Sequence, residues 1–239
     1  MNYELVLLAA GQGRRMEASQ NKVLIQLLGK PVIEYVLTTF VQDKACQHII
    51  LVVEKNEQLL IETIVQQNQF DKQKPITIVV GGTERQDSVY NGLQKLKNET
   101  GIVMIHDGAR PFLEPNFLKE LYQTAERTDA AILGMPVKDT IKKVNKNTVI
   151  ETIPRELLWQ IQTPQAFKIP LIQKVHANAK IEGFFGTDDA SLVEHYGQPV
   201  SIVEGSYENI KLTTPIDLVI GEAILKARMR QDSIKEEKS

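Results

Sequence analysis

A short glycine-rich stretch near the N-terminus carries the residue types expected of a phosphate-binding loop. Residues Ala9–Met16 read AAGQGRRM and directly follow an apolar run that ends at Leu8. Small residues and glycines allow the backbone to approach a phosphate, and its free N–H groups form a nest for an anion. Arg15 and Lys22 add two cations, which are the charges that stabilise a reacting triphosphate.

Taken alone, this loop agrees with several kinds of site. A dinucleotide fingerprint requires Gly or Ala where Met16 stands, and a Walker loop requires G-K-[ST] four residues after its first glycine, which this sequence lacks. A nucleotidyltransferase loop, in which arginine supplies charge to a triphosphate, fits Arg15 and Lys22. A tight strand-to-helix turn without a ligand is the structural alternative.

A second candidate position lies at the end of a later apolar run. The segment HDGARP (His106–Pro111) follows Ile102–Ile105. An aspartate at the carboxyl end of a strand is a natural partner for a metal ion or a ribose, so Asp107 is a candidate ligand. A structural ion pair between Asp107 and Arg110 is the alternative. The histidines fit no metal-ligand or triad spacing and are interpreted as structural: His48, His106, His176 and His195.

Hydrophobic patterning predicts the elements that must position these residues. Short runs that are apolar on both faces are typical of a covered parallel sheet, and amphipathic helical stretches separate them. The alternation predicts an open, doubly wound α/β sheet, in which ligands bind beyond the carboxyl ends of the strands. We expect strands at Leu5–Leu8, Ile49–Val53, Ile76–Val80, Ile102–Ile105, Ala131–Gly134 and Val200–Val203, and helices at Val32–Val41, Gln58–Gln67, Ser88–Leu96, Phe117–Arg127, Leu171–Ala179, Ala190–Tyr196 and Pro215–Met229.

The pattern changes after Pro136. Apolar residues between Ile141 and Ile150 alternate around the polar turn Asn145-Lys146-Asn147, which predicts a β-hairpin. Both a surface excursion and a dimerisation arm agree with it. We therefore expect a single domain over residues 1–230, with residues 137–156 as an inserted arm and residues 231–239 as a disordered tail.

Composition narrows the classes of function. The 239 residues include 28 Lys and Arg against 30 Asp and Glu, a net charge of −2. No global basic field exists, so we expect no nucleic-acid partner, and a few placed cations must hold any anionic substrate. The single Cys46 excludes an internal disulfide and a multi-cysteine zinc site. No apolar run suits a signal peptide or a membrane span, so we expect a soluble, cytoplasmic protein without a membrane partner.

Eight ordered blocks lie between Leu7 and Leu218. They are AAGQGRRM (Ala9–Met16), LLGKPVIEY (Leu27–Tyr35), GGTERQDSVYNGL (Gly81–Leu93), HDGARPF (His106–Phe112), PVKDTIK (Pro136–Lys142), LWQIQTPQAF (Leu158–Phe167), TDDASLVE (Thr187–Glu194) and NIKLTTPIDL (Asn209–Leu218). In this order they resemble the 2-C-methyl-D-erythritol 4-phosphate cytidylyltransferases of the non-mevalonate isoprenoid pathway. The resemblance implies a Rossmann-like α/β nucleotidyltransferase fold, a mostly parallel sheet covered by helices, with a protruding β-arm for homodimerisation. It also implies transfer of CMP from CTP to the polyol phosphate, with Mg2+ or another divalent cation as cofactor.

The resemblance further implies roles for individual residues. Arg15 and Lys22 match the catalytic cations around the triphosphate. The positions that match the CTP site are Ala9, Ala10, Gly11, Gly13, Arg15, Lys22, Gly81, Gly82, Ser88, Asp107 and Arg110. Those that match the polyol phosphate site are Asp107, Thr140, Arg155, Thr163, Thr187 and Lys211, with Thr140 and Arg155 reaching the neighbouring subunit's site. Asp107 would also lie near a Mg2+ ion held mainly by the nucleotide phosphates.

One departure from the family pattern concerns the residue before Lys22. Asn21 stands where the family commonly has proline, and asparagine restrains φ less than proline does. We therefore expect a more mobile loop before CTP binds. We also expect Arg85 to position the loop or the phosphates, and Thr187 to cap a helix that begins at Asp188 or Asp189.

Two other functions compete with this one. Ribitol-5-phosphate cytidylyltransferases share the fold and several blocks, although the segments GGTERQDSVYNGL, HDGARP, LWQIQTPQ and TDDASLVE are closer to the methylerythritol enzyme. A non-catalytic nucleotide-binding protein of the same fold is the second. Such a protein would not need cations for two substrates, and this chain retains both sets.

Overall fold

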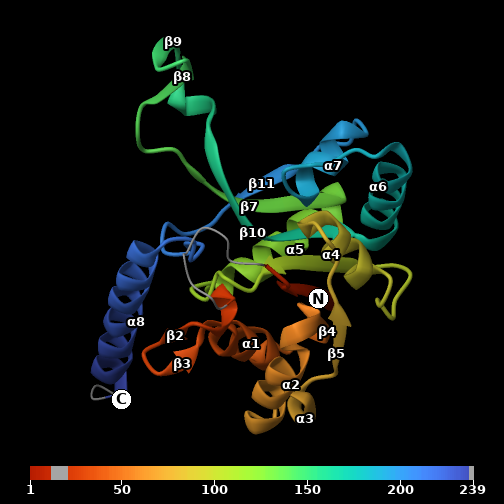
Figure 1. The fold of residues 1–239 in the computed structure, drawn as a ribbon, viewed down its shortest axis with the longest axis vertical. Helices are drawn as coiled ribbons and strands as arrows, with labels where there is room; N and C mark the ends of the chain where they lie inside the picture. Colours follow the sequence, from red (N-terminus) through yellow and green to blue (C-terminus); the bar gives the residue numbers. More distant parts are fainter. Residues whose placement is uncertain (12–20, 237–239) are drawn as a thin grey trace.

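The structure is a computed structural model that describes residues 1–11 and 21–236 of the chain. A seven-stranded sheet runs through the centre of the molecule (Figure 1), in the order β11-β7-β10-β6-β1-β4-β5. β10 is antiparallel to β6 and β7, whereas the other pairs in this sheet are parallel. The strands are β1 (Tyr3–Ala9), β4 (Cys46–Val53), β5 (Ile76–Val80), β6 (Ile102–Asp107), β7 (Ala130–Pro136), β10 (Trp159–Lys168) and β11 (Ser201–Glu204).

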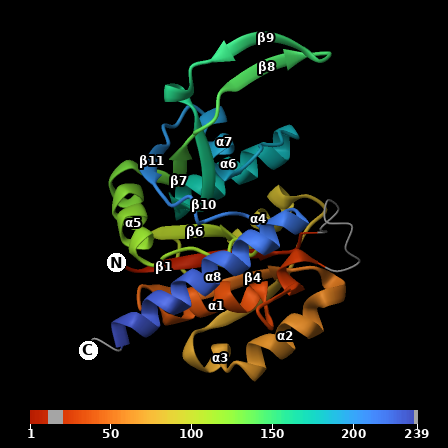
Figure 2. The same ribbon diagram turned by 90° about the vertical axis from the view of Figure 1, so that its left-hand side faces the viewer.

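Helices cover both faces of this sheet, which explains why its central strands are apolar throughout. Leu5 and Leu7 of β1 pack with α1, α2 and α5 on one face, while Val6 packs with α4, α6 and α7 on the other. α8 lies outside this sandwich (Figure 2) and buries Leu225 beside Phe112. The helices are α1 (Val32–Gln42), α2 (Gln58–Gln67), α3 (Phe70–Gln73), α4 (Arg85–Leu93), α5 (Asn116–Thr128), α6 (Ile169–Glu182), α7 (Asp189–His195) and α8 (Pro215–Glu236).

The predicted parallel α/β sheet is confirmed, and most predicted elements lie within a few residues of their observed bounds. Two differences concern helix ends. α4 begins three residues before the expected Ser88, and α8 continues to Glu236, so residues 231–236, which we expected in a disordered tail, are helical. In the described part of the chain, no helix is both long enough and apolar enough to cross a membrane.

The sequence pattern did not predict β10 in the central sheet, nor the short β2 (Gln26–Leu27) and β3 (Lys30–Pro31), which form a two-stranded sheet of their own. Gln160, Gln162, Thr163 and Gln165 interrupt the apolar pattern that identified the other strands, and Pro164 is a further break. β10 nevertheless inserts between β6 and β7, and Gln162, Thr163 and Gln165 are buried there with hydrogen-bond partners. Its polar side chains therefore serve the site rather than the core.

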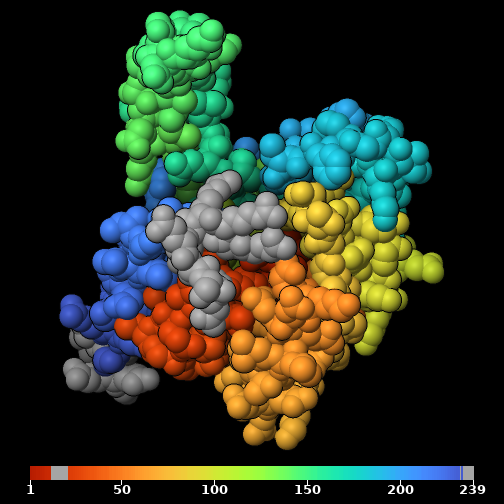
Figure 3. All heavy atoms as spheres, viewed as in Figure 1, coloured from red at the N-terminus to blue at the C-terminus, as the bar shows by residue number. Residues whose placement is uncertain are grey.

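The predicted hairpin projects from the body between β7 and β10 (Figures 1 and 3). It consists of β8 (Ile141–Asn145) and β9 (Thr148–Ile153). Lys146 and Asn147 have φ values of 43° and 66°, as a two-residue type I′ turn requires. Val144, Val149 and Ile150 are each more than half exposed, so the arm presents apolar side chains that this chain does not cover.

Candidate active site

Two cavities, each of about 490 Å3, open at the carboxyl-terminal ends of the parallel strands. Their volumes lie in the range of small-molecule sites. The first is lined by Ala10, Gly11, Lys22, Gly82 and Ser88 among others, and the second by Arg110, Thr163 and Thr187 among others. Arg85, Asp107 and Lys211 line both cavities. The site is therefore bipartite, with a charged group where its halves meet.

Close packing of small residues shapes the wall of the first cavity. A Cβ atom on Gly81 would lie 2.6 Å from the Cβ of Ala10 and 2.8 Å from the Oγ of Ser88, and one on Gly82 would collide with Asp87. The N–H of Gly82 donates a hydrogen bond to Ser88 Oγ at 3.1 Å. Glycine at both positions therefore allows the end of β5 to pack closely against Ala10 and the start of α4.

Asn21 fixes the segment that carries Lys22 into the first cavity. Its Nδ2 donates to Ala9 O at 2.8 Å and to Glu57 Oε2 at 2.6 Å. The expected mobility of the loop before CTP binds stays a prediction, since residues 12–20 lie outside the described residues. At Asn21 itself the side chain is buried and hydrogen-bonded, and its φ of −59° is one that proline adopts. Lys22 Nζ donates to Thr213 O at 3.1 Å, which places the ammonium at the cavity wall.

Asp107, the last residue of β6, is surrounded by cationic side chains. Lys211 Nζ lies 2.7 Å from Oδ2, Arg85 Nε 3.4 Å from Oδ1, and Arg110 Nε 3.9 Å from Oδ2. Burial alone would raise the pKa of Asp107, but the charges of Arg85, Lys211 and Arg110 hold it well below its usual range. The ion pair with Arg110 exists, yet it is the longest of these contacts, so Asp107 is not a partner of Arg110 alone.

Arg110 extends this cationic group toward the second cavity. Its Nη1 donates to Asn209 O at 2.8 Å and its Nη2 to Ile161 O at 3.4 Å. Arg110, Arg85 and Lys211 share Asp107, and Arg85 also contacts Asp189, so three cations face two carboxylates there. The meeting point of the cavities is therefore electropositive and suited to anionic ligands, even though the whole chain carries a net charge of −2.

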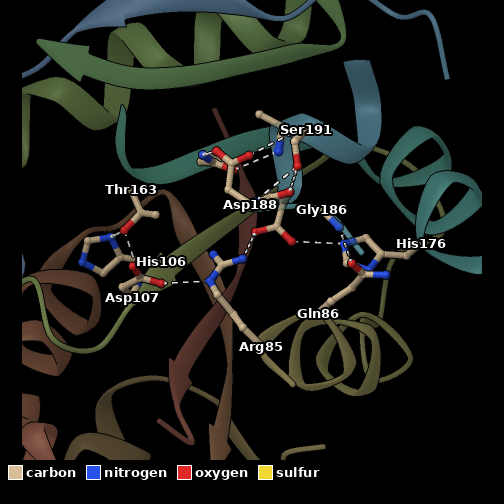
Figure 4. Close-up of polar contacts among 12 residues, drawn as sticks. Arg85, Gln86, His106, Asp107, Thr163, His176, Gly186, Asp188 and Ser191 are labelled. Atoms are coloured by element: carbon tan, nitrogen blue, oxygen red, sulfur yellow. Dashed lines mark hydrogen bonds and ion pairs between the residues drawn. The ribbon is translucent and has the colours of Figure 1, made fainter. Parts of the chain in front are cut away.

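Thr163 couples β10 to the end of β6 (Figure 4). Burial lowers the pKa of His106 to about 4, so its ring is neutral. Its Nε2 lies 3.1 Å from the carbonyl of Arg110 and must donate there, which leaves Nδ1 to accept from Thr163 Oγ1 at 3.1 Å. Thr163 Oγ1 in turn accepts the N–H of Asp107 at 3.0 Å. Thr163 lines the second cavity, but its hydroxyl hydrogen is committed to His106.

The start of α7 forms the opposite wall of the second cavity. Asp188, not Thr187, caps this helix, because its carboxylate accepts the N–H of Ser191 at 2.9 Å. The expectation that Thr187 is the cap is therefore wrong, and Thr187 lines the cavity instead. Gln165 holds this turn in place, since its Nε2 donates to Asp188 Oδ2 at 2.7 Å and its Oε1 accepts the N–H of Ala190.

The remaining candidate residues lie elsewhere. Thr140 and Arg155 are exposed on the arm and line neither cavity, and Arg155 Nη1 donates to Lys138 O at 3.1 Å. Ala9 is buried at the end of β1. Gly13 and Arg15 lie outside the described residues. The structure thus brings the other candidates together around the two cavities, with Gly81 packed against Ala10 and Ser88, and leaves the arm residues apart from them.

Sequence reasoning missed several polar residues that support the site. Gln162, Gln165 and Asn209 had no assigned role, yet Asn209 Nδ2 donates to Thr163 O at 3.0 Å and to Gln162 Oε1 at 3.2 Å. Asp189 was considered only as part of a helix start. The signal that could have identified Gln162 and Gln165 is a run of glutamines between apolar residues of one strand. Such amides persist in a core only with hydrogen-bond partners.

Comparison with known proteins agrees with this geometry. A family model described as "IspD: 2-C-methyl-D-erythritol 4-phosphate cytidylyltransferase" matches residues 3–227. The proteins of that name from Geobacillus kaustophilus and Halalkalibacterium halodurans are 52% and 49% identical to this chain, each over 97% of the chain and 100% of its own length.

Solved structures give the same result. The chain resembles the 4-diphosphocytidyl-2C-methyl-D-erythritol synthase of Anaerococcus prevotii with a TM-score of 0.83 and 31% identity, over 94% of this chain and 98% of that one. For the 2-C-methyl-D-erythritol 4-phosphate cytidylyltransferase of Thermus thermophilus, the TM-score is 0.77 at 28% identity, with coverage of 95% and 100%. The chain belongs to the 2-C-methyl-D-erythritol 4-phosphate cytidylyltransferase (IspD) family.

Proposed function

We propose that this protein transfers CMP from CTP to 2-C-methyl-D-erythritol 4-phosphate, giving 4-diphosphocytidyl-2-C-methyl-D-erythritol and pyrophosphate. The observation that carries the proposal is the junction of two ligand-sized cavities at Asp107, where Arg85 and Lys211 line both. Two polyanions must meet for this reaction, and cations at the junction offset their repulsion. The family membership supports the same reaction.

The first cavity is the proposed CTP site. Ala10, Gly82 and Ser88 line it, with Gly81 packed against Ala10 and Ser88, and these small residues would leave backbone groups to contact the base and the ribose. The same positions match the CTP site that the family resemblance implies, which supports a cytosine base here. Lys22 would bind the triphosphate together with Arg15, which the sequence places in the same glycine-rich stretch.

The second cavity is the proposed site of the polyol phosphate. In the reaction, a phosphate oxygen of the polyol attacks the α-phosphorus of CTP, and the bond to pyrophosphate breaks with its electrons leaving on the pyrophosphate oxygen. A phosphate monoester is already nucleophilic, so no strong general base is needed. Asp107, whose pKa is held low, would accordingly orient Lys211 and Arg85 rather than remove a proton.

A divalent cation fits this site only when the nucleotide brings it. Within residues 1–11 and 21–236, no three His, Cys, Asp or Glu side chains are grouped to hold a metal. Mg2+ commonly binds through one or two carboxylates together with substrate phosphates. Among the described residues, Asp107 is the acidic side chain that lines both cavities. It would therefore contact the bound cation. Bound Mg2+ would neutralise charge on the triphosphate.

We further propose that the active form is a homodimer joined through the arm, residues 137–156. Thr140 and Arg155 are exposed and line neither cavity of their own chain, and apolar Val144, Val149 and Ile150 are uncovered. Burying such side chains against a second copy would stabilise the pair. In that dimer, Thr140 and Arg155 would complete the polyol phosphate site of the partner subunit.

The activity is tested by following pyrophosphate release with Mg2+ and CTP, and with each polyol phosphate in a separate reaction. We expect turnover with 2-C-methyl-D-erythritol 4-phosphate and little with ribitol 5-phosphate. Faster turnover with ribitol 5-phosphate would overturn the choice of substrate. No pyrophosphate with either compound would favour a non-catalytic nucleotide-binding protein.

A further inference from the structure

A carboxylate behind the site holds one of its cations. Asp189 begins α7, is 1% exposed and lines neither of the two large cavities. Its Oδ2 lies 2.8 Å from Arg85 Nη1, and its Oδ1 lies 3.1 Å from Nε2 of the buried His176. Burial alone would raise the pKa of Asp189, but the neighbouring Arg85 and His176 lower it, so this carboxylate is charged.

Arg85 connects this buried carboxylate to the active site, and Figure 4 shows its contact with Asp107. Its Nη1 contacts Asp189 at 2.8 Å, and its Nε contacts Asp107 Oδ1 at 3.4 Å. Because the guanidinium is planar, fixing Nη1 also fixes the direction in which Nε points. Arg85 Nε donates a hydrogen bond to Asp107 Oδ1, whereas the shorter contact with Asp189 is an ion pair. The buried charge of Asp189 therefore holds the guanidinium from behind, and the hydrogen bond directs it toward Asp107.

The next residue of α4 reinforces this link. Gln86 Nε2 donates to Phe184 O at 2.9 Å, and Gln86 Oε1 accepts the N–H of Gly186 at 3.0 Å. Phe184 and Gly186 lie just before Thr187, which lines the second cavity. The start of α4, at the first cavity, is therefore joined to the start of α7, at the second, through Arg85 and Gln86.

We propose that Asp189 is a positioning residue that orients Arg85 across the junction of the two cavities, so that Arg85 and Lys211 approach Asp107 from opposite oxygens. The inference rests on the proposed function, because the junction is where the two substrate phosphates would meet. Without Asp189, the Arg85 fork loses its shorter contact and is free to turn toward Asp107 or a substrate phosphate. Substrate binding in the ground state would then change little, but the two reacting phosphates would be positioned less precisely.

The test is a double-mutant cycle with Asp189→Asn and Arg85→Gln, measured as steady-state pyrophosphate release. We expect Asp189→Asn to lower kcat about ten-fold, within the range of couplings between contacting residues. The KM for CTP should stay within about three-fold, because Ala10, Gly11 and Lys22 do not contact Asp189. In the Arg85→Gln background, the same substitution should change kcat by less than about two-fold.

Glu222→Gln is the matched control, since it removes the carboxylate of an exposed ion pair of 2.9 Å with Lys226 on α8. It should retain full activity. An Asp189→Asn protein as active as this control would overturn the inference. An equal loss of kcat on Asp189→Asn in the unsubstituted and the Arg85→Gln backgrounds would also overturn it, because that result indicates a purely structural role. No pyrophosphate from the unsubstituted protein would instead contradict the proposed function.

A second variant covers the case in which Asp189→Asn does not fold. Arg85 is about a third exposed, so Arg85→Lys should fold, with a melting temperature near that of the control. A lysine ammonium keeps the charge but cannot place two fixed donors on two carboxylates. We expect about a ten-fold lower kcat from Arg85→Lys. An unchanged kcat in this folded variant would overturn the inference.

Discussion

Replacing Asn21 by alanine should destabilise the protein and slow its reaction, because one buried amide holds the segment that carries Lys22. The substitution removes the donors to Ala9 O at 2.8 Å and Glu57 Oε2 at 2.6 Å. It also removes the acceptor of the Val23 N–H, at 3.3 Å. The short 3-10 helix at Lys22–Leu24 thereby loses its cap.

The structure sets the size of this effect. A neutral hydrogen bond contributes about 1 kcal/mol, and we assign a similar value to the bond with Glu57, which is partly exposed. The long bond to Val23 adds little, so Asn21→Ala should cost about 2 kcal/mol of unfolding free energy. For a chain of this size, that corresponds to a melting temperature lower by roughly 4–8 °C. A displaced Lys22 should lower kcat about ten-fold.

Thermal unfolding and pyrophosphate release, measured on the same preparations, check both numbers. Asn21→Pro is the matched variant, because proline keeps φ near the observed −59° but lacks the amide. We expect it to retain more stability than Asn21→Ala without regaining the full value. An Asn21→Ala protein whose stability lies within about 0.5 kcal/mol of the unsubstituted protein would refute the reasoning.

Three further predictions follow from the same geometry. Lys22→Ala should lower kcat by orders of magnitude while the circular dichroism spectrum remains unchanged. A near-normal rate would show that Lys22 has no role in the reaction. Arg155→Ala and Lys22→Ala proteins, each nearly inactive, should regain partial activity when refolded together, and no recovery in proven mixed dimers would place Arg155 in its own subunit's site. Folding lowers the pKa of His106 to about 4, so the unfolded chain binds more protons than the folded one below pH 6.5. The free energy of unfolding measured in urea should therefore fall by up to about 3 kcal/mol from pH 7 to pH 4. The fall should be smaller in His106→Gln.

The sequence alone predicted the parts of the fold that depend on local pattern. Ile49–Val53 is apolar at every position because helices cover both faces of β4, and the bounds of α2 at Gln58–Gln67 agree with its amphipathic spacing. The turn at Lys146-Asn147 could also be predicted, because it depends on the residue types within the turn itself. Hydrophobic periodicity did not predict β10, because the polar side chains of this strand are buried through hydrogen bonds with residues distant in the sequence.

The candidate site shows the same division. The glycine-rich stretch, Asp107 and Lys211 were identified from residue types and from a family resemblance, and the structure places Lys211 next to Asp107 although 104 residues separate them. For Asn21, only the freedom of its backbone could be considered from the sequence, because Ala9 and Glu57, the partners of its side chain, are distant in the chain. The link from Asp189 to Arg85 joins residues that are far apart in sequence, so spacing could not reveal it.

The central claim is that the two cavities hold the two substrates and meet at Asp107. A crystal structure of the protein with its product, 4-diphosphocytidyl-2-C-methyl-D-erythritol, tests this most directly. The account predicts the cytidine beside Ala10, Gly81 and Ser88, the methylerythritol beside Thr187, and the diphosphate at Lys211 and Arg85. Density with both ends of the product in one cavity, or with the diphosphate away from Lys211, would contradict it.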